Sequence, residues 1–154
     1  MATYSHYQPK KNDNIKTPKE VWSNIKEYIP TDKTIWCPFY YKGEHTLKEL
    51  GYNIIHEDKD FFKTTPPSNS ICIDNPPFSL KKQVLERLLE LDIPFILIMP
   101  VSTLCYKYFK KFKDKIQIIV PPKRYNFMDN KSSATFDCLY YCYKITLKKD
   151  IIFI

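Results

Sequence analysis

The chain has few glycines, no long apolar segment and no paired-cysteine motif. Its longest apolar runs, such as that from Pro94 to Val101, are far shorter than the roughly 20 residues that span a bilayer, and its polar N-terminus does not read as a signal peptide. Five cysteines without a Cys-x-x-Cys pair fit neither a disulfide framework nor a zinc site. Two glycines leave few positions where the backbone can closely approach a ligand. We therefore expect an intracellular, cytoplasmic protein with reduced core cysteines and no membrane segment.

The composition is that of a globular protein with a basic surface. Hydrophobic residues make up 44% and charged residues 27% of the 154 positions, which predicts one globular domain, over residues 17–154. Residues 1–16 are polar and lack periodicity, which predicts a flexible N-terminal arm. The net charge of +7 and an aromatic content of 16% favour a polyanionic partner, and nucleic acid is the obvious one. The alternative is a lysine-rich surface that is simply solvated.

One stretch stands out for its order of residue types. Three apolar residues, Ile71–Ile73, lead into Asp74 and Asn75, and Pro76-Pro77 follows. Proline fixes φ and has no N–H for a sheet ladder, so a strand must end here. In an open α/β sheet, ligands bind at the carboxyl ends of the strands, which makes this polar turn a candidate for chemistry. The alternative is a turn with an Asx cap.

Two other proline pairs serve as comparisons within the same chain. Pro66-Pro67 has no strand before it, and Pro121-Pro122 has no side-chain acceptor ahead of it. Only the stretch ending in Phe78 combines a strand, an asparagine, two prolines and an aromatic residue.

The segment Asn75-Pro76-Pro77-Phe78 resembles the catalytic motif of S-adenosylmethionine-dependent adenine N6 methyltransferases, which is Asp, Asn or Ser, then Pro-Pro, then an aromatic residue. The resemblance implies that the Asn75 side-chain oxygen and the Pro76 carbonyl accept the two N–H bonds of the target amine, without a metal. Pro76 and Pro77 would preorganise these acceptors, and Phe78 would stack on an adenine flipped out of its helix.

The same resemblance assigns a cofactor site. Thr17-Pro18 is similar to the motif near the methionine end of the cofactor. Pro38-Phe39 occupies the slot of the main cofactor motif, although Cys37 replaces the usual acid and residues 40–44 replace the glycine-rich turn. The run Ile35–Phe39 resembles phage-like members of the family.

Acidic and aromatic residues after the second predicted strand complete this site. Glu57 or Asp58 would bind ribose hydroxyls. Asp60 would accept from the cofactor's adenine, and Phe61 would pack against its ring. The alternative is a charged turn with two core phenylalanines.

The periodicity predicts an alternation of helices and strands. Thr17 and Glu20 form a capping box that begins a helix over Pro18–Ile29. Further helices are expected over 45–50, 80–91 and 102–113, with Leu104 inward in the last, and strands over 34–39, 52–56, 71–73, 95–99, 116–120 and 136–146. This order resembles a Rossmann-like class I methyltransferase: a mostly parallel seven-stranded α/β sheet, an antiparallel pair at its edge and helices on both faces.

The link between the last two predicted strands is basic and aromatic. In the resembled family this loop helps to build the pocket for the extruded base. Tyr125 or Phe127 would stack there, and Lys123 or Arg124 would hold phosphate. The alternative is an ordinary basic hairpin loop.

The first hypothesis is therefore an S-adenosylmethionine-dependent enzyme that methylates the N6 amine of adenine in nucleic acid, with DNA favoured over RNA. The second is a catalytically silent nucleic-acid-binding or partner subunit on the same fold. A third is a methyltransferase of amide nitrogens such as protein glutamine. Because only short segments remain outside the predicted core, we expect a short target sequence or help from a second copy or subunit.

Overall fold

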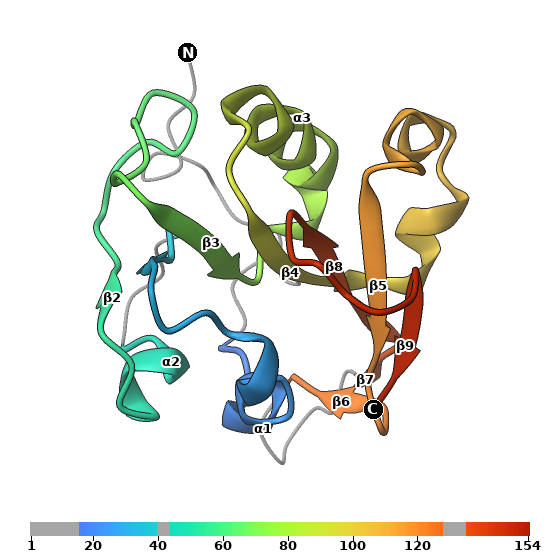
Figure 1. Cartoon of the computed structure of the whole chain (residues 1–154), viewed down its shortest axis with the longest axis horizontal. Helices are drawn as coiled ribbons and strands as arrows, with labels where there is room; N and C mark the ends of the chain where they lie inside the picture. The colour runs from blue at the N-terminus through green and yellow to red at the C-terminus, as the bar shows by residue number, and fades with distance from the viewer. Residues whose placement is uncertain (1–15, 40–43, 128–134) are drawn as a thin grey trace.

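The computed structural model describes residues 16–39, 44–127 and 135–154 (Figure 1). The main sheet has seven strands in the order β2-β1-β3-β4-β8-β5-β9. Their bounds are β1 Thr34–Trp36, β2 Ile54–Ile55, β3 Ser70–Asp74, β4 Phe95–Pro100, β5 Ile116–Val120, β8 Cys138–Tyr143 and β9 Ile151–Phe153. Two short strands, β6 Tyr125–Asn126 and β7 Thr135–Phe136, pair separately. The chain is thus a mixed α/β fold.

The sheet is mostly parallel. Strands β2, β1, β3 and β4 pair in parallel, so their carboxyl ends lie at one edge. The antiparallel pairing predicted for the last two strands is confirmed, since β8 runs antiparallel to β5. Its predicted place at the sheet edge is wrong. Strand β8 also pairs with β4, and the unpredicted β9 takes the outer position beside β5.

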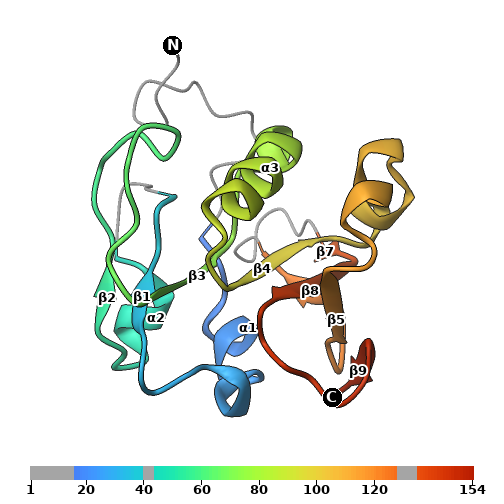
Figure 2. The ribbon, with the colours of Figure 1, turned by 45° about the horizontal axis from the view of Figure 1, so that its top comes forward.

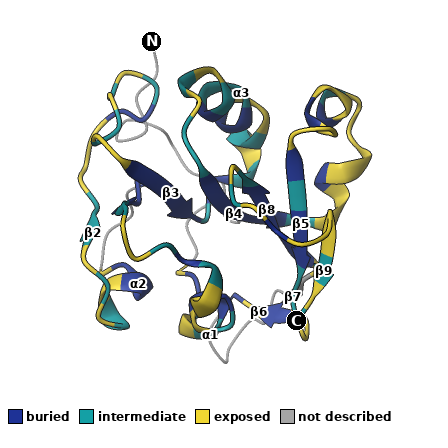
Figure 3. Cartoon of the chain, in the orientation of Figure 1, coloured by how far each residue is buried: buried dark blue, intermediate teal, exposed yellow. Residues whose placement is uncertain are grey.

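Helices cover both faces of the sheet, as predicted (Figure 2). In β3, Ile71 and Ile73 point to one face and Cys72 to the other, because successive side chains of a strand alternate. The first face packs on α1 (Lys19–Ser23) and α2 (Thr46–Glu49). The second packs on α3 (Lys81–Leu91) and the 3-10 turns before β5. Figure 3 shows the resulting buried central sheet.

The helix predicted over Pro18–Ile29 is broken into α1 and a 3-10 turn, η1 (Lys26–Tyr28). Its apolar face is confirmed, because Val21 and Trp22 are fully buried. The predicted capping box is wrong: Pro18 stands at the N-cap and no side chain caps the helix. The Thr17 hydroxyl instead receives a hydrogen bond from a distant residue of the motif.

The helix predicted over 102–113 is also wrong. Two 3-10 turns, η3 (Val101–Cys105) and η4 (Lys107–Phe112), take its place. They are separated by Tyr106, whose ψ of 139° is that of extended backbone. The break turns Leu104 outward, contrary to the prediction, whereas Phe109 and Phe112 are buried.

The predicted arm falls almost wholly on residues 1–15, which lie outside the described part of the chain. Its last residue, Lys16, forms an ion pair with Glu49 at the end of α2. In the described ranges no helix is both long and apolar enough to cross a membrane.

Candidate functional site

The Asn75 motif lies at the carboxyl end of β3, between the parallel neighbours β1 and β4. Strand β3 is buried throughout and ends at Asp74, one residue before the prolines, whose missing N–H groups predict such an end. A 3-10 turn, η2 (Phe78–Leu80), then leads into α3. Pro76 and Pro77 are buried and Phe78 is half-buried. The motif is therefore held between a buried strand and a helix.

The side-chain amide of Asn75 is oriented by one hydrogen bond. Its Nδ2 donates to Thr17 Oγ1 at 3.0 Å. Its Oδ1 is buried and has no hydrogen-bond partner among the residues that the structure describes. A buried polar atom without a partner costs free energy, so an acceptor left in this state is a sign of a ligand-binding or catalytic role. The structure thus joins a residue predicted to be catalytic to one predicted to bind the cofactor.

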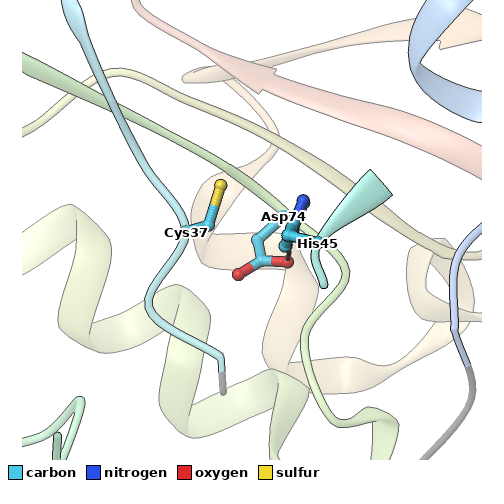
Figure 4. A group of neighbouring side chains, drawn as sticks. All are labelled: Cys37, His45 and Asp74. Atoms are coloured by element: carbon cyan, nitrogen blue, oxygen red, sulfur yellow. Dashed lines mark hydrogen bonds and ion pairs between the residues drawn. The ribbon is translucent and has the colours of Figure 1, made fainter. Parts of the chain in front are cut away.

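Asp74 connects the motif to the loop that follows β1. Its Oδ2 accepts the Phe39 backbone N–H at 3.0 Å, and its Oδ1 accepts the Asn75 N–H at 2.8 Å. The His45 ring contributes a further contact, from Nε2 to Oδ1 at 3.0 Å. Figure 4 shows Asp74 close to His45. This buried carboxylate therefore sets the position of Phe39 relative to Asn75.

The hydrogen bonds of His45 determine which ring nitrogen carries the proton. His45 precedes α2, and its Nδ1 accepts the Leu47 backbone N–H at 3.1 Å. The proton must then be on Nε2, which donates it to Asp74. Our sequence predictions did not include Asp74 or His45 in the site. The available signal was an acidic residue directly before the Asn-Pro-Pro run.

Cys37, His45 and Asp74 place three ligand atoms within 4.8 Å of one another, a spacing at which they could hold a metal ion. Their hydrogen bonds favour a different role. The Cys37 thiol donates to the Ile73 carbonyl at 3.2 Å, and burial together with the charge of Asp74 raises the pKa of this thiol well above its usual value. A metal would need the thiolate and an unprotonated His45 Nε2. We therefore assign the cluster to positioning, and the predicted absence of a metal stays a prediction.

A second buried acceptor lies among the predicted cofactor residues. Asp60 Oδ1 accepts the Phe62 backbone N–H at 3.0 Å, which holds the turn after β2. Asp60 Oδ2 is buried and has no hydrogen-bond partner within residues 16–39, 44–127 and 135–154. This is the atom type that the resemblance assigns to the cofactor's amino group.

A cavity of about 10 Å³ lies next to this turn. It is lined by Trp36, Pro38, Glu57, Lys59, Phe61 and Thr64. Such a volume is about that needed by one water molecule, so a nucleoside-sized cofactor needs side chains to move. Glu57 and Lys59 form an exposed ion pair at 3.1 Å. Because both side chains are exposed, they are the ones that can move to enlarge the cavity.

Most of the predicted cofactor residues are brought together by this arrangement. Pro38, Glu57 and Phe61 line the cavity, and the rings of Phe39 and Phe61 lie 4.9 Å apart. Asp58 is exposed and does not line the cavity. Thr17 and Pro18 do not line it either, and Thr17 contacts Asn75 instead. Residues 40–43, predicted to replace the glycine-rich turn, lie outside the described ranges.

The predicted substrate loop divides into two kinds of residue. Lys123 and Arg124 are exposed and pair with Glu20 at 2.8 Å and with Asp137 at 2.5 Å. Tyr125 and Phe127 are buried in the core on the α1 side of the sheet. Stacking on an extruded base needs an exposed ring face, so the structure does not support that role for either ring.

No match to a known protein was found. This holds for family models, for curated proteins and for solved structures. The evidence for function is therefore the position of Asn75 Oδ1 and Asp60 Oδ2, two of several buried side-chain atoms without a hydrogen-bond partner in the described ranges, and the contacts that connect their surroundings.

Proposed function

We propose that the chain is an S-adenosylmethionine-dependent methyltransferase that acts on the N6 amine of adenine in nucleic acid, with DNA favoured over RNA. The observation that carries the proposal is Asn75 Oδ1 at the carboxyl end of β3, a buried acceptor without a partner in the described part of the chain, whose orientation is set by Thr17. The mostly parallel sheet with helices on both faces is compatible with the Rossmann-like class I fold that we propose for it.

Methylation of the adenine amine depends more on hydrogen-bond acceptors for its N–H groups than on a general base. The exocyclic amine of adenine is a poor nucleophile because its lone pair is delocalised into the ring. Asn75 Oδ1 and the Pro76 carbonyl accept its two N–H bonds and favour a localised lone pair. Acceptors that are fixed before the reaction stabilise the charge that develops without reorganising. Pro76 and Pro77 provide this rigidity, and Asp74 fixes the backbone N–H of Asn75.

Five side chains would hold the cofactor, which supplies an electrophilic methyl group when bound. Asp60 Oδ2 accepts from its adenine amino group, and the Glu57 carboxylate accepts from its ribose hydroxyls once released from Lys59. Pro38, Phe39 and Phe61 form the apolar wall. The Asp74 contact with the Phe39 N–H connects this wall to Asn75.

The second candidate is a catalytically silent nucleic-acid-binding or partner subunit. It is favoured by the cavity of only about 10 Å³ at the proposed cofactor site. The third candidate, a methyltransferase of glutamine side chains, would use the same Asn75 acceptor on an amide nitrogen.

Calorimetric titration with S-adenosylmethionine separates the first candidate from the second. We expect a single site with micromolar to high-micromolar affinity, and no binding at millimolar concentration would reject the enzyme. Mass spectrometry of a reaction with isotopically labelled methyl donor, single-stranded and duplex DNA, RNA and a glutamine-containing protein then identifies the product. Label in N6-methyladenine supports the proposal, and label in methylglutamine selects the third candidate.

A further inference from the structure

The segment between β4 and β5 exposes apolar side chains beside lysines. Val101 is 37%, Leu104 40% and Tyr106 45% exposed. Residues 101–113 contain four lysines and no acidic residue. In Figure 3 this segment is largely exposed. We call the set Lys81, Val101, Leu104, Tyr106 and Lys107 the Tyr106 surface.

The Tyr106 surface adjoins the Asn75 motif. Lys81 Nζ donates to the Phe78 carbonyl at 3.3 Å and lies 4.6 Å from the centroid of the Tyr106 ring. Val101 directly follows β4, the neighbour of β3 in the sheet. The surface and the motif are therefore on the same edge of the sheet and are connected by the Lys81 hydrogen bond to Phe78.

The ring of Tyr106 is held in place by contacts with its neighbours. It stacks on Tyr108 with ring centroids 5.5 Å apart and an angle of 15° between the planes. Phe109 and Phe112 anchor η4 in the core, and the Tyr106 N–H bonds to the Thr103 carbonyl. A ring fixed in this way loses little conformational freedom when it binds a flat ligand.

We propose that the Tyr106 surface binds unpaired nucleotides next to the target adenine. Lys81 moves from the face of the Tyr106 ring to a phosphate and so opens that face. Tyr106 and Leu104 then contact base faces, and Lys107 contacts a second phosphate. Base faces are exposed in a single strand and hidden in a duplex, which is why an aromatic and apolar patch with lysines suits unpaired nucleotides. Only the position of these nucleotides next to a methylated adenine rests on the proposed function. Binding of the strand itself is measured without methyl transfer.

Fluorescence anisotropy of a labelled single-stranded DNA of about 12 nucleotides tests this, with a matched duplex in parallel. Tyr106→Ala should raise Kd about tenfold, because a base loses the aromatic ring on which it stacks. Tyr106→Phe keeps the ring and should bind with a Kd close to that of the unmodified protein. Lys107→Glu should weaken binding and lower the salt slope by about 1. The controls are Phe153→Ala, an aromatic residue 78% exposed on β9, and Lys148→Glu, an exposed lysine next to that strand.

The outcomes separate this inference from the proposed function. Unchanged Kd in Tyr106→Ala, equal losses in the Phe153→Ala control, or no strand binding by the unmodified protein would each overturn it. If Tyr106→Ala loses strand binding while the unmodified protein binds no S-adenosylmethionine, the binding surface is supported and the methyltransferase function is rejected. If adenine is methylated and Tyr106→Ala binds and methylates normally, the enzyme stands and the inference does not.

Discussion

Thr17 and Asn75, 58 positions apart in the chain, meet through one hydrogen bond of 3.0 Å from Asn75 Nδ2 to Thr17 Oγ1. This contact decides which side of the amide is available to a substrate. Since the donor is occupied, the oxygen is left as the unpaired acceptor. Thr17 is thus a positioning residue for Asn75.

Replacing Thr17 by valine removes the acceptor and keeps the shape of the side chain. The amide of Asn75 then loses its preferred orientation, and we expect the rate of methyl transfer to fall about tenfold, the equivalent of one lost hydrogen bond. Thr17→Ser keeps the hydroxyl and should stay close to the unmodified rate. Equal rates for the valine and serine variants under saturating cofactor would show that Thr17 does not orient Asn75.

Asp60→Asn tests the proposed cofactor contact. Asparagine keeps an oxygen for the Phe62 N–H but turns the unpartnered Oδ2 into a donor, which repels the donor of an adenine amino group. We expect the affinity for S-adenosylmethionine to fall by about tenfold or more with little change in unfolding temperature. Asp114→Asn, at an exposed position, is the matched control. Calorimetry that gives the same Kd for both variants would remove Asp60 from the site.

The free energy of unfolding should decrease in alkaline solution. Burial raises the pKa of Cys138 and Cys142 from 9.0 to about 12, and burial also raises the pKa of Tyr140 above its usual value. Their contribution is fully present below the unfolded thiol pKa of 9.0 and is lost as the pH rises towards the folded values. Each such group lowers stability by about 1.4 kcal/mol per pH unit in that range.

Urea unfolding between about pH 8 and pH 11 measures this decrease. The double variant Cys138→Ala with Cys142→Ala starts less stable, because it leaves small cavities. Its stability should nevertheless fall less steeply above pH 9.0, where the thiols begin to ionise in the unfolded chain. A pH dependence identical to that of the unmodified protein would show that these thiols are not buried.

The parts of the fold that could be predicted are those fixed by local sequence. Strand β4 is a continuous apolar run, β5 is apolar except for Gln117, and β3 is stopped by prolines, so their positions were predicted to within about one residue. Gly51 follows α2 with a φ of 93°, a backbone conformation that glycine adopts readily after the end of a helix. The short β9 gave no such signal, since the four apolar residues after Lys148–Asp150 fit a loop as well as a strand.

The contacts inside the site could not be predicted, because they connect distant segments. The motif itself was found from Asn75 to Phe78, yet the bonds from His45 and Phe39 to Asp74 cross 29 and 35 positions of the chain. The burial of Tyr125 was missed because a basic, proline-led segment is typical of an exposed loop. Its hydroxyl in fact bonds to Tyr140 at 2.6 Å in the core.

The chain alone should recognise only a short target sequence with low specificity, or it should need a second copy or subunit for recognition. Reading several base pairs takes an interface of roughly 1,000 Å² with dedicated base contacts, which the short loops of this chain hardly provide. Phosphate contacts should also make activity fall steeply with salt. Sequencing of methylated adenines in mixed DNA and RNA checks both points, and a long unique site methylated by a monomer would contradict them.

The central claim is that Asn75 Oδ1 accepts the amine of a target adenine. Its most direct test is the yield of N6-methyladenine, measured by liquid chromatography and mass spectrometry, for the unmodified protein and Asn75→Ala side by side. We expect methylated adenine from the first and at least a hundredfold less from the second, or about 2.7 kcal/mol of transition-state stabilisation. Affinity for S-adenosylmethionine and unfolding temperature should stay nearly unchanged, since the lost side chain has one hydrogen bond in the folded protein. Equal yields from both proteins, or loss of cofactor affinity in step with activity, would contradict the account.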